Sequence, residues 1–375
     1  MLLGIAAAGL AFAASDGLEW NAKALQLYRT AHYAEAEAMY RRALDTFDRA
    51  GEGAGLNRAL TLENIAVMLR AQGRYAESEK LHLQALPRIG DLTGTESLAT
   101  VRAVSNLAAL YWSRGKLEQA EPLALRAEVA FHDLWEANQA DRSSNRQILA
   151  SIYLAQHRYG DAEKLLHSTL DSGDAANAVT ANSNLAAAAL GVSDNARAEE
   201  YARHGVEIAL RDLPARHPLA AVALNNLAQA CRFQGKHLEA ENYYRQAIGT
   251  WEDALGAQHP DLARGLMNLA AFYHDRGREA GAEDLYTRAV AILERTLGTH
   301  SAEALVVRNE LADVLRAERR YTEAERLSRA TLAAMQGRFG EGDPRLVRAQ
   351  INCARLQEET LRLVQAKKMK VGTLR

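Results

Sequence analysis

The sequence predicts an all-α solenoid of helix-turn-helix units, because it contains an internal repeat, a helical apolar period and a regular Ala-Glu step. His217 to Gly256 and His259 to Gly298 align without a gap, and most of their landmarks return 42 residues later. A fixed period of this length is typical of stacked supersecondary units. One such unit cannot bury its apolar face alone, so neighbouring units must stack.

The same register extends outward over eight units. An Ala-Glu or Ser-Glu step recurs every 42 residues, except for one interval of 36 between Glu163 and Glu199. We place the missing residues in the loop near Asp171 to Asn177, because a loop tolerates shortening better than a helix. The glutamates of the step are Glu37, Glu79, Glu121, Glu163, Glu199, Glu241, Glu283 and Glu325.

Apolar residues in each unit follow helical spacing on both sides of a turn that usually contains Gly. In the sixth unit, Leu224, Leu227 and Cys231 precede the turn, and Ala240 and Tyr244 follow it. This pattern predicts two antiparallel helices per unit. Where the turn lacks Gly, we expect less regular packing. The residues at those turns are Ala31, His157, Ser193 and Arg319.

One unit carries the whole pattern in Leu266, Leu269, Ala270, Tyr273, Gly277, Ala282, Tyr286 and Ala289. This order resembles the tetratricopeptide repeat. The 42-residue period and the closing Leu-Gly-x-x-His-Pro are similar to the longer version found in kinesin light chains and many bacterial proteins. The resemblance covers residues 20 to 341 and implies a right-handed superhelix of about eight repeats.

The predicted organisation has three parts: a possible signal peptide at residues 1–14, the solenoid at 15–343, and a capping helix with a basic tail at 344–375. Leu2 to Ala14 is an apolar run that ends near a small-x-small step and is too short to span a bilayer. Cleavage there would imply a periplasmic or secreted protein. Because no Lys or Arg precedes the run, an uncleaved helix on the first repeat of a cytoplasmic protein is the alternative.

Composition argues against several classes of function. The 45 basic and 47 acidic residues nearly balance, which disfavours nucleic acid as a partner. Cys231 and Cys353 lie about three repeats apart, so we expect two buried thiols and neither a disulfide nor a metal site. Motifs of hydrolases, metalloproteases and nucleotide-binding loops do not occur, so we expect no catalytic residues and no cofactor.

A row of asparagines stands just before the Leu, or its substitute, of the first helix in most units. In the family that the chain resembles, this position lines the concave surface. An amide both donates and accepts, so it can bind the backbone of an extended peptide. Alternatively, each Asn bridges adjacent helices. The row consists of Asn64, Asn106, Asn184, Asn226, Asn268 and, in the cap, Asn352.

A second row lies six residues further along the same helices. It is mainly basic and aromatic at both ends and apolar in the middle, so it could hold acidic side chains and an apolar anchor of a peptide. Alternatively, it is a solvated face. The row consists of Tyr28, Arg70, Trp112, Leu154, Leu190, Arg232, His274 and Arg316.

These observations lead to the hypothesis of a non-enzymatic scaffold that binds an extended or helical peptide of a partner protein, which could be acidic. The alternative is a regulatory or targeting subunit for an enzyme encoded separately, for example a protease. A third hypothesis is an enzyme with an unrecognised site inside the superhelix. Fold alone does not choose among them, and the oligomeric state stays open.

Overall fold

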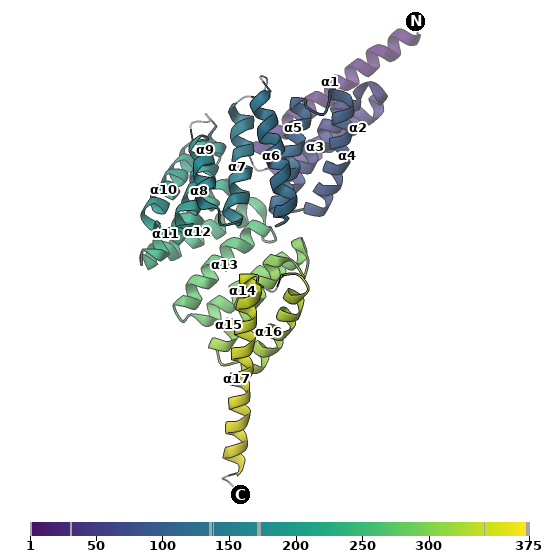
Figure 1. Cartoon of the computed structure of the whole chain (residues 1–375). Coiled ribbons are helices and arrows are strands. Elements are labelled where there is room, and N and C mark those ends of the chain that lie inside the picture. The colour runs from purple at the N-terminus through teal and green to yellow at the C-terminus, as the bar shows by residue number, and fades with distance from the viewer. Residues whose placement is uncertain are drawn as a thin grey trace. The chain divides into compact units, whose positions relative to one another are not determined.

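The computed structural model describes residues 2–30, 32–134, 137, 139–170, 174–340 and 342–372. Within these residues the regular structure is entirely helical (Figure 1). The helices follow one another as eight helix-turn-helix pairs and a last helix, α17 (Pro344–Gly372). The prediction of an all-α repeat fold with eight units and a terminal helix is therefore confirmed.

Each repeat consists of a first and a second helix. The first helices are α1 (Leu2–Arg29), α3 (Gly55–Ala71), α5 (Leu98–Ser113), α7 (Gln139–Ala155), α9 (Ala175–Gly191), α11 (Pro218–Phe233), α13 (Pro260–Asp275) and α15 (Ala302–Ala317). The second helices are α2 (Tyr33–Ala50), α4 (Tyr75–Thr93), α6 (Leu117–Asp133), α8 (Tyr159–His167), α10 (Asn195–Asp212), α12 (His237–Leu255), α14 (Glu279–Leu297) and α16 (Tyr321–Gln336). A 3-10 helix, η1 (Gly51–Ala54), joins the first two repeats.

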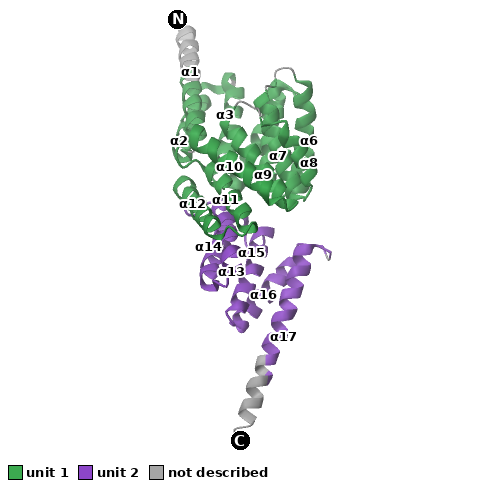
Figure 2. Cartoon of the chain, turned by 90° about the vertical axis from the view of Figure 1, so that its left-hand side faces the viewer, with its two compact units in different colours: residues 1–256 green, residues 257–375 purple. Residues whose placement is uncertain are grey.

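The chain divides into two compact units, residues 1–256 and residues 257–375 (Figure 2). Unit 1 holds six repeats, and unit 2 holds two repeats and α17. In unit 1 each first helix contacts the first helix of the following repeat, from α1 through to α11. In unit 2, α17 packs against α15 and α16. The first helices of unit 1 therefore form a continuous face.

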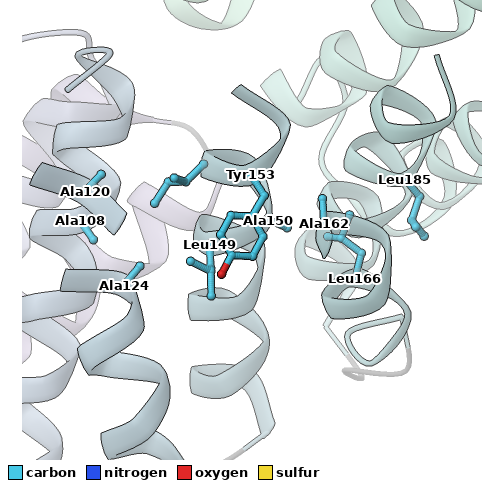
Figure 3. Packing of buried hydrophobic residues seen from close by; sticks show 10 residues of the cluster. Ala108, Ala120, Ala124, Leu149, Ala150, Tyr153, Ala162, Leu166 and Leu185 are labelled. Atoms are coloured by element: carbon cyan, nitrogen blue, oxygen red, sulfur yellow. The ribbon is translucent and has the colours of Figure 1, made fainter. Parts of the chain in front are cut away.

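Small residues let the two helices of a repeat approach closely. Ala228 of α11 and Ala240 of α12 are both completely buried, as are their counterparts in the other repeats. Larger side chains fill the space between repeats: Leu149 of α7, for example, lies in one core cluster with Ala124 of α6 (Figure 3). Close packing of this kind is the main source of stability in a repeat protein.

The His-Pro pairs mark helix starts. Pro218 and Pro260 are the first residues of α11 and α13, where a missing N–H does no harm. The preceding histidines also cap these helices: Nδ1 of His217 accepts the N–H of Leu219 at 3.2 Å, and Nδ1 of His259 accepts the N–H of Asp261 at 3.1 Å. Burial lowers the pKa of His217, which keeps its ring neutral and able to accept.

The turns that lack Gly keep the usual backbone conformation. His157, Ser193 and Arg319 have φ of 61°, 61° and 63°, close to the 72° of Gly73 and the 68° of Gly115. The absence of Gly therefore does not change the turn conformation at these three positions, and Ala31 lies outside the described residues. The expectation of less regular packing stays a prediction. A side chain in the left-handed region costs about 1–2 kcal/mol, which the packing of the repeats must offset.

The short interval of the repeat falls on a helix, which corrects the prediction that a loop absorbs it. Helix α8 has 9 residues, whereas the other second helices have between 16 and 19. The interval between the Ala-Glu steps of the fourth and fifth repeats is six residues shorter, but the chain must still reach the start of α9. Helix α8 therefore ends early, at His167, and the residues after it lead to α9.

The predicted boundary after residue 14 falls inside α1. The side chains of residues 2–14 lie outside the described part of the structure, as do those of the predicted basic tail. Among the described residues, no helix combines the length and the apolar character needed to cross a lipid bilayer. Cys231 and Cys353 are buried free thiols, as predicted, and burial raises the pKa of Cys231 to about 11.

Candidate functional site

The first-helix face of unit 1 carries two of the predicted asparagines as bridges between repeats. Nδ2 of Asn226 on α11 donates to the carbonyl oxygen of Ser183 on α9 at 2.7 Å. Nδ2 of Asn184 on α9 donates to Oγ of Ser151 on α7 at 3.2 Å. Both donors are used within the fold, which favours the bridging interpretation for these residues.

A third asparagine takes part in a buried polar cluster that the sequence analysis missed. Nδ2 of Asn106 on α5 donates to Oε1 of Glu63 on α3 at 3.1 Å, and Oε2 of Glu63 lies 2.9 Å from Nδ1 of His82 on α4. Glu63 and His82 are almost completely buried. A buried carboxylate needs such partners, so this cluster fixes the join between the second and third repeats.

Trp112 also joins repeats. Its Nε1 on α5 donates to the carbonyl oxygen of Ser151 on α7 at 3.1 Å, and the side chain is half-buried. Ser151 therefore accepts bonds from both α5 and α9. Leu154 and Leu190 are likewise half-buried against the core clusters. These members of the second row belong largely to the packing between repeats.

Asn64 and Arg70 of α3 differ from the residues above. Neither side chain has a hydrogen bond or ion pair to the described residues, although Nε of Arg70 is buried. The two residues are six positions apart on one helix, a separation of about 9 Å along its axis. Both are half-exposed on the first-helix face of unit 1. The Asn64 amide and the Arg70 guanidinium are thus both available to a ligand that lies along α3.

Arg232 lies at the other end of the first-helix face of unit 1. Its guanidinium carbon lies 5.4 Å from the ring centre of the neighbouring Phe233, which is largely exposed. A cation over an aromatic face is a weak attraction, about 0.5–1 kcal/mol at an exposed site. This pair offers both an apolar and a cationic surface.

In unit 2 the predicted basic residues are compensated internally. Nδ1 of His274 on α13 lies 2.6 Å from Oε2 of Glu279, and its Nε2 lies 3.4 Å from Oδ2 of Asp313 on α15. Nε of Arg316 donates to Oδ1 of the same aspartate at 2.8 Å, and Nη1 lies 3.5 Å from a carboxylate oxygen of Glu359 on α17. His274 and Arg316 therefore already have acidic partners within unit 2, and their role in binding a peptide stays a prediction.

These contacts change the pKa values of His274 and Asp313. The hydrogen bond with Asp313, supported by Glu279, raises the pKa of His274 to about 9 against the effect of burial. The hydrogen bond with His274 is the main reason why the pKa of Asp313 lies well below its usual value. At neutral pH His274 and Asp313 are therefore both charged, and their ion pair links the first helices α13 and α15. Of the other predicted residues in this unit, Asn268 is half-buried and Asn352 is buried.

The repeated glutamates have a structural role, because most of them pair with cations of their own repeat, of the next repeat or of both. Four residues on, Arg41, Arg203 and Arg245 pair with Glu37, Glu199 and Glu241 at 2.5, 2.7 and 2.8 Å, and Arg329 pairs with Glu325. In addition, a cation of the next repeat reaches back to the glutamate. These inter-repeat pairs are Arg74 with Glu37, Lys116 with Glu79, Arg158 with Glu121, Arg197 with Glu163, Lys236 with Glu199, and Arg320 with Glu283.

The inter-repeat pairs could have been predicted from the position of their cations in the sequence. Five of the six cations are the residue that precedes a second helix, four positions before the Ala-Glu or Ser-Glu step. The Glu199 carboxylate shows the result: burial opposes its ionisation, but hydrogen bonds from Lys236, Arg203 and Gln234 lower its pKa to about 2. In the described part of the chain, no group of acidic, His or Cys side chains is suited to a metal ion.

Solved structures with the same architecture include a Rap protein complexed with Competence and Sporulation Factor. It matches with a TM-score of 0.60 at 15% identity, over 94% of this chain and 99% of that chain. The Cut9–Hcn1 hetero-tetramer matches with a TM-score of 0.60 at 14% identity, over 87% and 54%. A putative kinesin light chain from Podosopora anserina matches at 21% identity with a TM-score of 0.32, over 62% and 93%. At these identities the first two matches show the fold alone.

No curated protein sequence matches this chain. The family model of the tetratricopeptide repeat does match, at residues 18–87, 57–128, 177–253 and 219–295. These segments span more than half of the chain and follow the same register as the Ala-Glu step. The chain is a member of the tetratricopeptide repeat family.

Proposed function

We propose that this protein is an interaction scaffold whose first-helix face in unit 1 binds an extended segment of a partner protein, with an acidic side chain at Arg70. The single observation that carries the proposal is the state of Arg70. Its guanidinium is partly buried and lacks an acceptor among the described residues, whereas Arg74, Arg114 and Arg158 of unit 1 all have carboxylate partners. A partly buried cation without a counter-charge favours an anionic ligand.

Asn64 supplies the second contact. Its amide is free of partners among the described residues and lies about 9 Å from Arg70 along α3. A residue in an extended peptide spans about 3.3–3.6 Å, so the two side chains would meet groups roughly three residues apart. Asn64 would bind the backbone whatever the peptide's sequence, and Arg70 would select a carboxylate. The peptide would cross the face toward the apolar middle and Phe233.

Two further facts support a binding role rather than catalysis. Repeats of this family generally serve as non-enzymatic interaction scaffolds, and the Rap protein with the same fold was crystallised in complex with a factor. In unit 2, His274 and Arg316 already have acidic partners, which directs the proposal to unit 1. If the protein is instead a regulatory subunit of a separate enzyme, the same face would bind a segment of that enzyme.

The test is a binding measurement with the full chain. Acidic peptides of about twelve residues would be selected on an array, and their affinities measured by fluorescence anisotropy. Arg70→Glu should weaken them by at least tenfold, equal to about 1.4 kcal/mol, and Asn64→Ala should weaken them about threefold to tenfold. Arg41→Glu on the second helix α2 is the matched charge control and should leave binding unchanged. Unaltered affinity in Arg70→Glu would refute the proposed site.

A second control separates binding from architecture. Asn226 donates to the backbone of the preceding repeat, so Asn226→Ala should lower the free energy of unfolding by about 1–2 kcal/mol and leave peptide affinity nearly unchanged. If Asn226→Ala weakened the peptide as strongly as Asn64→Ala does, the peptide would contact the bridging asparagines too. The site would then have to be enlarged beyond α3.

A further inference from the structure

Helix α17 repeats the sequence of a first helix but has no second helix beside it in the described residues. Asn352, Cys353 and Ala354 stand where the sixth repeat has Asn226, Leu227 and Ala228. One side of α17 is buried as expected, with Leu346 and Leu356 packed into clusters formed with α15 and α16. The other side is the surface that a second helix covers in every repeat.

The position of Ala354 shows how well this surface is preserved. In all eight repeats the equivalent residue is an alanine with 0% exposure, from Ala24 and Ala66 through to Ala312, because a second helix lies directly on it. Ala354 is the same small residue, yet it is exposed. An exposed helix position tolerates any long polar side chain, so composition alone does not require alanine there.

Apolar side chains accompany Ala354. Val347 is 38% exposed, whereas the equivalent Ala263 and Leu305 are completely buried. Ile351 is 54% exposed one helical turn further on. Gln350 and Gln357, both exposed, complete the surface. We call these five residues the α17 seat. Its mixture of apolar and amide groups suits a helix that binds reversibly rather than a permanent part of the core.

The charges beside the α17 seat indicate which kind of helix would bind there. Arg348, Arg355 and Arg362 recur every seven residues along one edge, so they lie in line on the helix. The first pairs with Glu310 and the last with Glu358, whereas Arg355 has no partner among the described residues. A second copy of α17 laid antiparallel on the seat would bring the same arginine edge from both chains together, which costs energy.

We infer that the α17 seat docks an amphipathic helix of a partner protein, with a small residue against Ala354 and acidic residues facing the arginine edge. The partner would complete a ninth repeat in trans. Its helix would resemble the second helices of this chain, in which a small residue is fully buried at the Ala-Glu step, as in Ala240. This surface is distinct from Asn64 and Arg70, so the inference does not depend on the proposed function.

A peptide with the sequence of α12, His237 to Leu255, is a suitable probe. It carries Glu239, Glu241, Glu252 and Asp253 against one Arg, and it contains the buried Ala240. The peptide would be acetylated, amidated and labelled with fluorescein, and its binding to the full chain followed by anisotropy. Saturable binding is expected, and a version with the four acids changed to the corresponding amides should bind at least threefold more weakly.

Variants of the chain then locate the site. Ala354→Trp should weaken the acidic peptide at least tenfold, because the indole blocks close approach, while thermal unfolding stays the same since Ala354 is exposed. Ala333→Trp, at an exposed alanine of α16, is the control and should bind like the parent chain. Arg355→Glu should weaken the acidic peptide but not its amide version.

Three results would overturn the inference. Full affinity in Ala354→Trp would show that the peptide binds elsewhere. Loss of binding in Arg70→Glu, with Ala354→Trp unaffected, would move the peptide to the first-helix face of unit 1. Concentration-dependent dimers of the chain that Ala354→Trp abolishes, without peptide binding, would make the occupant a second copy.

Discussion

His274 and Asp313 link the first helices of the seventh and eighth repeats, with Nε2 of the imidazole 3.4 Å from Oδ2 of the carboxylate. Arg316 holds the other oxygen of Asp313, so the aspartate is shared by two cations. His274 and Arg316, both predicted as peptide-binding residues, thus also contribute contacts within the fold. We therefore expect the stability of unit 2 to depend on pH.

The pH dependence follows from the raised pKa of His274. The folded value of about 9 exceeds the ordinary 6.5, so the protonated ring stabilises the folded state fully below about pH 6.5. That contribution declines as pH rises and is lost above about 9. Urea unfolding at pH 6 to 9.5 should show this loss, and His274→Gln should remove roughly 1–3 kcal/mol at pH 6 and flatten the profile.

The matched control for that experiment is His300→Gln, at an exposed histidine just before α15. It should keep both the stability and the pH profile of the parent chain. An undiminished alkaline decline in His274→Gln would assign the pH dependence to other groups.

The turns that lack Gly should be sites of easy stabilisation. Ser193→Gly and Arg319→Gly should each raise the free energy of unfolding by about 1 kcal/mol, because glycine adopts a φ near 60° without strain. The reverse change, Gly277→Ala, places a side chain at φ 68° in open space and should cost a similar amount. Chemical denaturation would measure all three. A loss of stability in both glycine variants would contradict the strain argument.

Gly191 and Tyr159 should be coupled. A Cβ at Gly191, the last residue of α9, would lie 2.2 Å from a ring carbon of Tyr159, the first residue of α8. Gly191→Ala should therefore cost about 1–3 kcal/mol, and a Tyr159→Ala background should remove most of that cost. Gly160→Ala, where a Cβ meets nothing within 4 Å, is the control. Additive costs in the double variant would mean that the cost of Gly191→Ala does not come from the Tyr159 ring.

The fourth repeat should be the least stable part of unit 1. Helix α8 has 9 residues and contributes two fully buried side chains, Ala162 and Leu166. Short elements with few buried contacts open locally at low free energy. Hydrogen exchange followed by mass spectrometry should label α8 before α10, which has 18 residues. Equal protection of the two helices would contradict this prediction.

Export stays a prediction about residues 1–14. Expression in the native host with a C-terminal tag should yield a protein shortened by about thirteen residues if the apolar run is a signal peptide. Intact mass spectrometry measures the start of the chain directly. A cytoplasmic product that begins at Met1 would favour the uncleaved helix.

The periodic features of the fold could be predicted from the sequence, because each repeat presents the same local pattern eight times. The helix pairs, the Pro-initiated helices and the buried alanines follow from residues within one unit. The shortening of α8 could not be predicted, because the choice between helix and connection depends on the distance that the chain must cover to α9. Helical period does not encode that distance.

The candidate site was predicted only in part, for a related reason. The asparagine positions were found, but their partners lie about one repeat away: Ser183 for Asn226, and Glu63 for Asn106. Sequence spacing places a side chain on a face and does not show which donors are used by the neighbouring helix. Arg70 became distinctive only by comparison with arginines that have acceptors.

The pairs between each glutamate and the cation of the next repeat have a consequence for how the chain can change length. Glutamate and cation belong to different repeats at the six junctions where the pair is seen, so the glutamate of one repeat accepts a bond from the cation of the next. Deleting or duplicating one whole repeat joins the remaining ones through the same pair, whereas a cut within a repeat leaves a carboxylate without its cation. Gain or loss of a whole repeat therefore leaves the ion pair between the joined repeats intact. Repeat proteins with such pairs can vary in the number of repeats without losing the contact that joins them.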